Sequence, residues 1–237
     1  MSESLRATLE RLAQPGAEPN AAFDRLLADY ARFHLVLALL ALGLLAAAAA
    51  FAVSAWRHAR SAPAGTGRRW TFERTTWSFA LLAAVGTVLI AGVLAAANLS
   101  TASDPLPGFR SSIPMIADRA PETDAGQEQQ AFDRWLQSGE RAMPADVRSA
   151  VDERLSWQRP KAIVCAVLLG LVLFAAARLW RSILHRSRRP DHRWRAGELG
   201  RLTAALGVSG VAFLLVLMVF GNTQASLAPV SMTLFFG

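Results

Sequence analysis

The sequence predicts an all-α fold, a four-helix transmembrane bundle with a small helical cap on the extracytoplasmic side. The chain is 53% hydrophobic, which is too apolar for an ordinary soluble domain. A helix needs about 20 apolar residues to cross a bilayer. Four stretches of about this length hold no charged side chain: Leu35–Trp56, Ser78–Asn98, Ala162–Ala177 and Leu202–Pro229.

The four predicted spans cover residues 33–56, 78–98, 161–180 and 202–222. The third is the shortest charge-free stretch. It reaches a full span if the side chain of Arg178 extends toward the headgroups and the helix continues to Trp180. We therefore expect a multi-pass membrane protein of the plasma membrane.

The loops between the spans differ in charge, and this predicts the orientation. Loop 57–77 holds five arginines against one glutamate. Loop 181–201, counted with the adjacent Arg178, holds eight arginines against two acids. Short basic loops stay in the cytoplasm. Both termini and the segment 99–160 are therefore expected outside.

The extracytoplasmic cap is expected to be helical. Segment 1–32 should hold two short amphipathic helices, one over residues 2–14 and one that Asn20 caps. The second, with Leu26, Leu27 and Tyr30 at helical spacing, is expected to lie along the outer membrane surface.

The cap segment 99–160 divides into two parts. Prolines predict irregular chain from Ser100 to Gly126, followed by helices over 127–138 and 144–157. Pro160 is expected to mark the start of the third span. A segment this short rarely builds a sufficient core, so these helices should lean on each other, on the membrane or on a partner.

The apolar tail 223–237 needs burial because leaving a Phe or Leu in water costs about 1.5–3 kcal/mol. It could pack on its own bundle, contact a partner, or bind or gate a ligand. Polar residues at the ends of the second and fourth spans predict an outer-rim cluster, which consists of Asn98, Ser100, Thr101, Asn222, Thr223 and Gln224.

The spans hold no ionisable group at their centres, which argues against a proton relay or a haem between helices. We predict no catalytic, cofactor-binding or metal-binding residues. An enzyme would have to use acid–base groups near the outer rim, and the candidates are His34, Asp29 and Asp104.

Arginines beside a bilayer are drawn to anionic lipid headgroups at about 1 kcal/mol each. This explains the basic loops without nucleic acid. The predicted anionic-lipid contacts at the cytoplasmic face are Arg57, Arg60, Arg68, Arg69, Arg178, Arg181, Arg186, Arg188, Arg189, Arg193 and Arg195.

Four sequence stretches carry a resemblance to known proteins: DYARFHLVLA (29–38), FERTTWSFALL (72–82), ANLSTASDPLPGF (97–109) and NTQASLAPVSMTLFFG (222–237). In these the chain resembles a group of uncharacterised four-span, multi-pass membrane proteins of high-GC Gram-positive bacteria. The resemblance implies a bacterial source and no activity.

Three functions follow as hypotheses. The first is a non-catalytic accessory or assembly subunit of a larger membrane complex, with a protein partner or a second copy of the chain. The second is a component of a small-molecule or lipid transporter or channel. The third is a membrane enzyme with an outer-face site.

Overall fold

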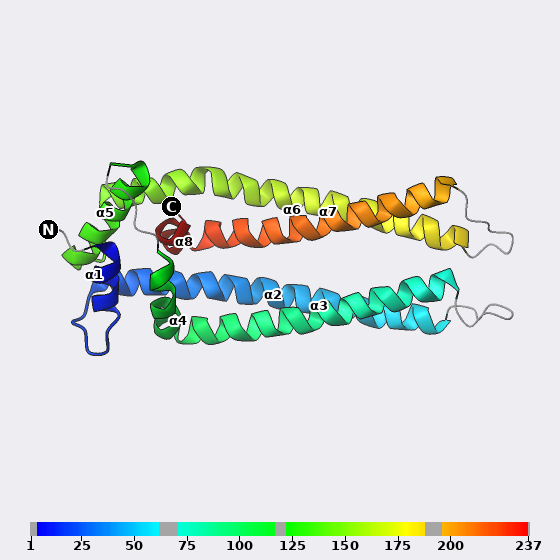
Figure 1. Ribbon diagram of the computed structural model, residues 1–237, viewed down its shortest axis with the longest axis horizontal. Coiled ribbons are helices and arrows are strands. Elements are labelled where there is room, and N and C mark those ends of the chain that lie inside the picture. The colour runs from blue at the N-terminus through cyan, green and yellow to red at the C-terminus, as the bar shows by residue number, and fades with distance from the viewer. Residues whose placement is uncertain (1–3, 62–70, 117–121, 188–195, 237) are drawn as a thin grey trace. The chain divides into compact units, whose positions relative to one another are not determined.

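The computed structural model describes residues 4–61, 71–116, 122–187 and 196–236. These contain helices and no strand, so the all-α prediction is confirmed. The elements in Figure 1 are α1 (Leu5–Leu12), α2 (Ala21–Ser61), α3 (Phe72–Ser103), α4 (Pro105–Ser112), the 3₁₀ turn η1 (Ile113–Met115), α5 (Asp124–Ser138), α6 (Ala145–Ser187), α7 (Ala196–Leu227) and α8 (Pro229–Phe236).

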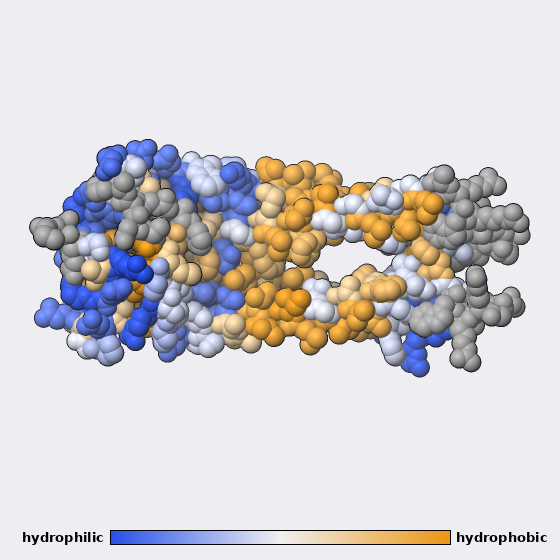
Figure 2. All heavy atoms as spheres, in the orientation of Figure 1, coloured by the Kyte–Doolittle hydropathy of each residue, from blue (hydrophilic) through white to orange (hydrophobic). Residues whose placement is uncertain are grey.

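Within the described residues, four helices are long and apolar enough to cross a membrane, namely α2, α3, α6 and α7. They contain the four predicted spans. Figure 2 shows apolar side chains, in orange, gathered over these helices. The chain is thus consistent with a multi-pass membrane protein.

The chain divides into two compact units, and each long helix contributes to both. The cap unit consists of Met1–Ala38, Ala96–Ala162 and Gly221–Gly237. The span unit consists of Leu39–Ala95 and Ile163–Phe220. The cap therefore draws on three parts of the chain, and both termini belong to it.

The cap unit has its own apolar core. The core combines Leu9 of α1, Leu26 and Tyr30 of α2, Phe109 of α4 and Trp135 of α5, all at most 6% exposed. Burial of each large side chain contributes about 1.5–3 kcal/mol. The predicted helix over 127–138 is confirmed as part of α5, with its apolar face in this core.

Side-chain hydrogen bonds join distant segments of the cap. The hydroxyl of Thr8 donates to a carboxylate oxygen of Asp133 at 2.6 Å, which joins α1 to α5. Asn20 caps α2, as predicted, because its Oδ1 accepts from the amide of Phe23 at 2.8 Å. Its Nδ2 donates to the carbonyl of Leu136, at the end of α5.

The prediction of irregular chain from Ser100 to Gly126 is wrong. The described part of this segment holds the end of α3, then α4, η1 and the start of α5. Pro105 and Pro107 stand in the first turn of α4, where the amide that proline lacks would have no helical partner. Prolines here favour helix starts.

The start of α2, for which the sequence predicts a position along the outer membrane surface, contributes to the cap core. Residues 21–61 form one continuous helix, and its first turns place Leu26 and Tyr30 in the cap core. The amphipathic pattern arises from contact with other cap helices, which remove these side chains from water.

Two long helices continue beyond the predicted limits of their spans. Pro160 does not interrupt α6, which continues from Ala145 to Ser187. A helix can tolerate a lost amide bond where neighbouring groups satisfy the carbonyl. Likewise α7 continues through Asn222, Thr223 and Gln224 to Leu227, and Pro229 then begins a separate helix, α8.

The C-terminal helix α8 packs within the cap of its own chain. The sequence left this kind of packing open beside contact with a partner and a role in binding or gating a ligand. Val230 and Leu234 are each 5% exposed and belong to the cap core. The ring of Phe235 lies 5.9 Å from that of Phe109 and 6.1 Å from that of Tyr30. Arg154 of α6 donates to the carbonyl of Met232 at 3.0 Å.

A buried carboxylate holds the start of α8. Oδ2 of Asp29, which is 6% exposed, accepts from the backbone amide of Ser231 at 2.8 Å. Amides in the first turn of a helix have no partner within the helix. Residue Ala228 before α8 has no side-chain acceptor, so Asp29 supplies from α2 the cap that the local sequence lacks.

The span unit consists of two antiparallel hairpins, α2–α3 and α6–α7 (Figure 1). The rings of His58 and Trp77 join the first pair, and the indole of Trp180 donates to Ser209 in the second. The buried positions of α2, α3 and α7 are mostly alanines at a spacing of seven residues: Ala41, Ala48 and Ala55; Ala84 and Ala91; Ala205 and Ala212. Small side chains at this spacing let neighbouring helices approach closely.

The buried cap of α8 predicts the effects of two substitutions. Asp29→Ala should lower the free energy of unfolding by about 1–3 kcal/mol, because it leaves the Ser231 amide unpaired. Asp29→Asn keeps an acceptor oxygen and should cost much less. Denaturation of the detergent-solubilised protein, followed by circular dichroism, measures both. Equal losses would contradict the capping role.

The same carboxylate predicts a dependence on pH. Asp29 precedes the charge-free stretch of α2, and burial raises its pKa above the ordinary value, although hydrogen bonds from Ser231 and the charge of Arg32 partly oppose this. Ionisation therefore destabilises the fold increasingly from about pH 3.9, the unfolded value, up to the higher folded pKa. Asp29→Asn should gain stability relative to the wild type across this window. If the wild type instead became more stable relative to Asp29→Asn as pH rises through this window, the prediction would be contradicted.

The buried alanines at a spacing of seven residues, which we call the alanine seam, predict the effect of a third substitution. Ala91 is 1% exposed, so Ala91→Leu should force α3 away from its neighbour and cost about 1–3 kcal/mol. Val93 on the same helix is 70% exposed, and Val93→Leu should have little effect. Thermal unfolding in detergent compares the two variants, and equal melting temperatures would show that the seam is not closely packed.

Candidate functional site

The cap ends of α2 and α3 are joined by a polar pair. Nδ1 of His34 lies 2.7 Å from Oδ1 of Asn98, so the ring nitrogen donates to the amide oxygen. Asn98 is 8% exposed, and the ring of Tyr30 packs against that of His34 at 4.6 Å. The hydrogen bond leaves Nε2 of His34 buried without a partner.

The cap ends of α6 and α7 carry two further buried amides. Gln158 and Gln224 are each 8% exposed. Among the described residues, Oε1 of Gln158 and Nε2 of Gln224 have no hydrogen-bond partner. A buried polar atom without a partner costs about 1–3 kcal/mol, and water or a ligand can relieve this cost.

Each long helix therefore places one polar side chain in its part of the cap unit, and we call these four the cap-end polar residues: His34, Asn98, Gln158 and Gln224. Three of them keep an unpaired donor or acceptor. Uncharged groups of this kind can bind water or the polar part of a ligand. His34 is the one member able to transfer a proton near neutral pH.

The outer-rim cluster predicted from the sequence contains two of these four residues. Asn98 and Gln224 are buried, Asn222 and Thr223 are half-buried, and Ser100 is exposed. The hydroxyl of Thr101 donates to the carbonyl of Ala97, one turn back in its own helix.

Sequence reasoning missed one cap-end polar residue, Gln158, and expected another partner for His34. Gln158 stands among Arg154, Arg159 and Lys161, and the one available signal was that it is uncharged within a charged turn. His34 was considered with a carboxylate partner. The structure pairs it with an amide instead, while the nearest candidate acid, Asp29, holds α8.

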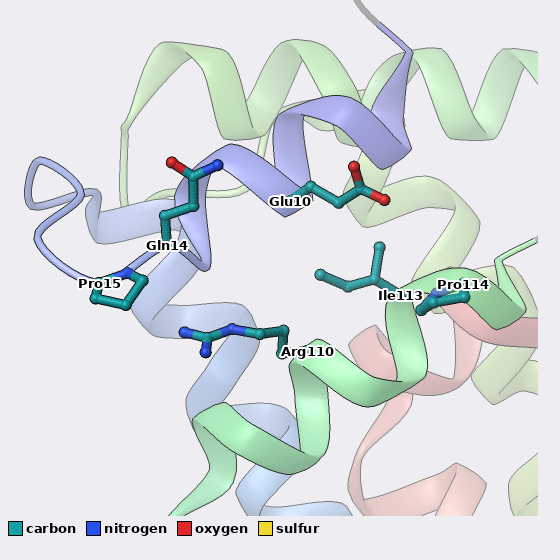
Figure 3. A pocket seen from close by; sticks show the side chains of 6 residues that line it. All are labelled: Glu10, Gln14, Pro15, Arg110, Ile113 and Pro114. Atoms are coloured by element: carbon teal, nitrogen blue, oxygen red, sulfur yellow. The ribbon is translucent and has the colours of Figure 1, made fainter.

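A pocket of about 420 Å³ opens on the surface of the cap between α1 and the α4–η1 segment (Figure 3). Glu10 and Arg110 line opposite walls, with Ile113 between them. Both charged groups already have partners within the chain. Nε of Arg110 donates to the carbonyl of Ala13 at 3.1 Å, and Glu10 lies 3.5 Å from Arg6.

Five of the predicted lipid-contacting arginines are described, and all are exposed: Arg57, Arg60, Arg178, Arg181 and Arg186. The guanidinium of Arg60 lies 5.1 Å from the ring centre of Trp56, and that of Arg178 lies 5.9 Å from that of Phe174. The others lie outside the described residues: Arg68, Arg69, Arg188, Arg189, Arg193 and Arg195.

Within the described ranges, no group of three or more His, Cys, Asp or Glu side chains is arranged to hold a metal ion. No family model, no curated protein and no solved structure matches the chain. The resemblance to four-span proteins of high-GC Gram-positive bacteria thus stays a prediction, and function has to be argued from the geometry.

The polar pair and the unpaired amide predict opposite responses to apolar substitution. Asn98→Leu should lower the free energy of unfolding by about 1–3 kcal/mol, because His34 loses its acceptor. Gln224→Met should cost nothing or stabilise, because Nε2 has no partner to lose. Thermal unfolding of both variants in detergent tests this. A large loss in Gln224→Met would reveal a bound partner for that amide.

Proposed function

We propose that this chain is a non-catalytic accessory or assembly subunit of a larger membrane complex. The observation that carries the proposal is the exposure of α6. In the most apolar 18-residue window of α6, 6% of the window is buried against the rest of the chain. The corresponding share is 17% in each of the other three long helices. The apolar window of α6 is thus the least covered of the four by the rest of the described chain.

The exposed side chains of α6 form a row along one face. Ile163, Val167, Leu171 and Phe174 recur at helical spacing, and each is 58–66% exposed. Lipid can cover an apolar row, and so can the helix of a partner. Because helices associate in lipid through close packing, a regular row of large side chains suits a partner helix with small residues.

The cap supports a structural role. Its hydrogen bonds run between distant segments, from Thr8 to Asp133 and from Asp29 to Ser231, and they join the two ends of the chain in one unit. We propose that this unit lies outside the plasma membrane of a bacterium, with both termini extracytoplasmic. Retention of the short basic loops in the cytoplasm is the physical support.

A specific observation favours a second candidate, a component of a small-molecule or lipid transporter. The unpaired atoms of His34, Gln158 and Gln224 are buried in the parts of three long helices that belong to the cap unit. Polar atoms at the border of a membrane segment can bind a polar solute or headgroup. A ligand that co-purifies with the wild type and is lost in Gln224→Met would support this function over the first.

The subunit proposal predicts that α6 contacts one protein in native membranes. A photoactivatable residue placed at Leu171 or Phe174 should give one discrete adduct with the same partner. The same residue at Leu89 of α3, 65% exposed, should give mainly lipid adducts.

Co-purification in mild detergent completes this test. Leu171→Ala with Phe174→Ala should reduce recovery of that partner several-fold, whereas the matched pair Leu82→Ala with Leu89→Ala should not. A chain that elutes alone and crosslinks only to lipid from both faces would refute the proposal. Deletion of α8 is unsuitable because it would remove part of the cap core.

A further inference from the structure

We propose that the loop-side ends of α2 and α3 form a binding site for the headgroup of an anionic phospholipid. In this site the indole N–H of Trp77 donates to a phosphate oxygen, and Arg57 and Arg60 balance the negative charge. The site is distinct from the cap and from the α6 surface that carries the proposed function.

A stacked pair of rings defines the position of the indole. The rings of His58 and Trp77 lie 4.6 Å apart, with an angle of 17° between their planes. His58 belongs to the last turn of α2 and Trp77 to the start of α3, so the stack joins the two ends of one hairpin. The contact restricts the direction in which the N–H points.

The indole N–H of Trp77 is buried and has no acceptor in the described structure. The other hairpin provides an internal comparison, because the indole of Trp180 donates to the hydroxyl of Ser209 at 3.2 Å. The described residues thus provide an acceptor for the indole of Trp180 and none for that of Trp77. A ligand that brings an acceptor beside Trp77 would remove the penalty of an unpaired buried donor.

The charged residues near His58 and Trp77 in the chain favour binding of an anion. Arg57 and Arg60 are exposed in the last turns of α2, and Arg74 lies one turn before Trp77. Glu73, which is 5% exposed, is the one acid among these four residues, so they carry three positive charges and one negative charge. Arginine and tryptophan are both favoured at the membrane–water interface.

These features select an anionic phospholipid from the possible occupants. Its phosphate brings the acceptor that Trp77 lacks and a negative charge for the arginines. A zwitterionic lipid brings the same acceptor with a cationic group that three arginines repel. The ends of both helices continue into apolar spans, which would accommodate the acyl chains of a lipid but offer nothing to a free phosphate ion.

Native mass spectrometry of the detergent-solubilised full chain tests the proposal. Phosphatidylglycerol or phosphatidylcholine with identical acyl chains is added to the wild type, Trp77→Phe and Trp180→Phe. We expect the wild type to retain phosphatidylglycerol in preference to phosphatidylcholine. Trp77→Phe keeps the stacked ring but lacks the N–H, so it should bind phosphatidylglycerol about tenfold more weakly, the usual effect of one hydrogen bond to a charged group.

Three control measurements distinguish a lipid site from a general effect of losing a tryptophan and from a site for a free anion. Trp180→Phe should bind phosphatidylglycerol like the wild type, because its N–H is already used inside the chain. Arg57→Gln with Arg60→Gln should remove the preference between the two lipids. Equal retention of both lipids by the wild type, or equal binding by the two tryptophan variants, would overturn the proposal. Displacement of the lipid by inorganic phosphate alone would show that the site binds a free anion instead.

Discussion

The cap depends on one interaction between residues 202 positions apart, the hydrogen bond from the Ser231 amide to the Asp29 carboxylate. A carboxylate buried in this way is costly unless hydrogen bonds satisfy it. The start of α8 provides those bonds and in return gains the cap that its own sequence lacks. This exchange brings Val230 and Leu234 of α8 into the cap core that α2 also enters.

The membrane helices follow a different principle. In lipid, apolar side chains gain little by leaving their surroundings, so helices associate where backbones can approach closely. The alanines of α2 and α3 provide this approach within one hairpin, and large side chains such as Leu89 and Phe174 remain on the outside. The cap is thus held by burial of large groups, while the spans are held by contact between small ones.

Several polar side chains lie near the two ends of the apolar spans. Nδ1 of His34 pairs with Asn98 in the cap unit, and the indole of Trp180 donates to Ser209 in the second hairpin. Other groups at the same levels, including Gln224 and Trp77, keep an unpaired atom. The unpaired atoms of Gln224 and Trp77 thus lie near opposite ends of the apolar spans, where the transporter candidate and the proposed lipid site would each place a ligand.

The sequence by itself determined the number of apolar helices. The length of a stretch without charged residues can be counted in the sequence, and the thickness of the hydrocarbon core sets how long such a stretch must be to span it. The sequence also determined the Asn20 cap of α2 and the apolar face of α5, since both depend on neighbouring residues. Only the tertiary structure decided that Asp29 caps α8, that His34 meets Asn98, and that Gln158 is buried. These depend on contacts between helices far apart in the chain, and no local pattern of residues specifies which polar side chains such contacts will enclose.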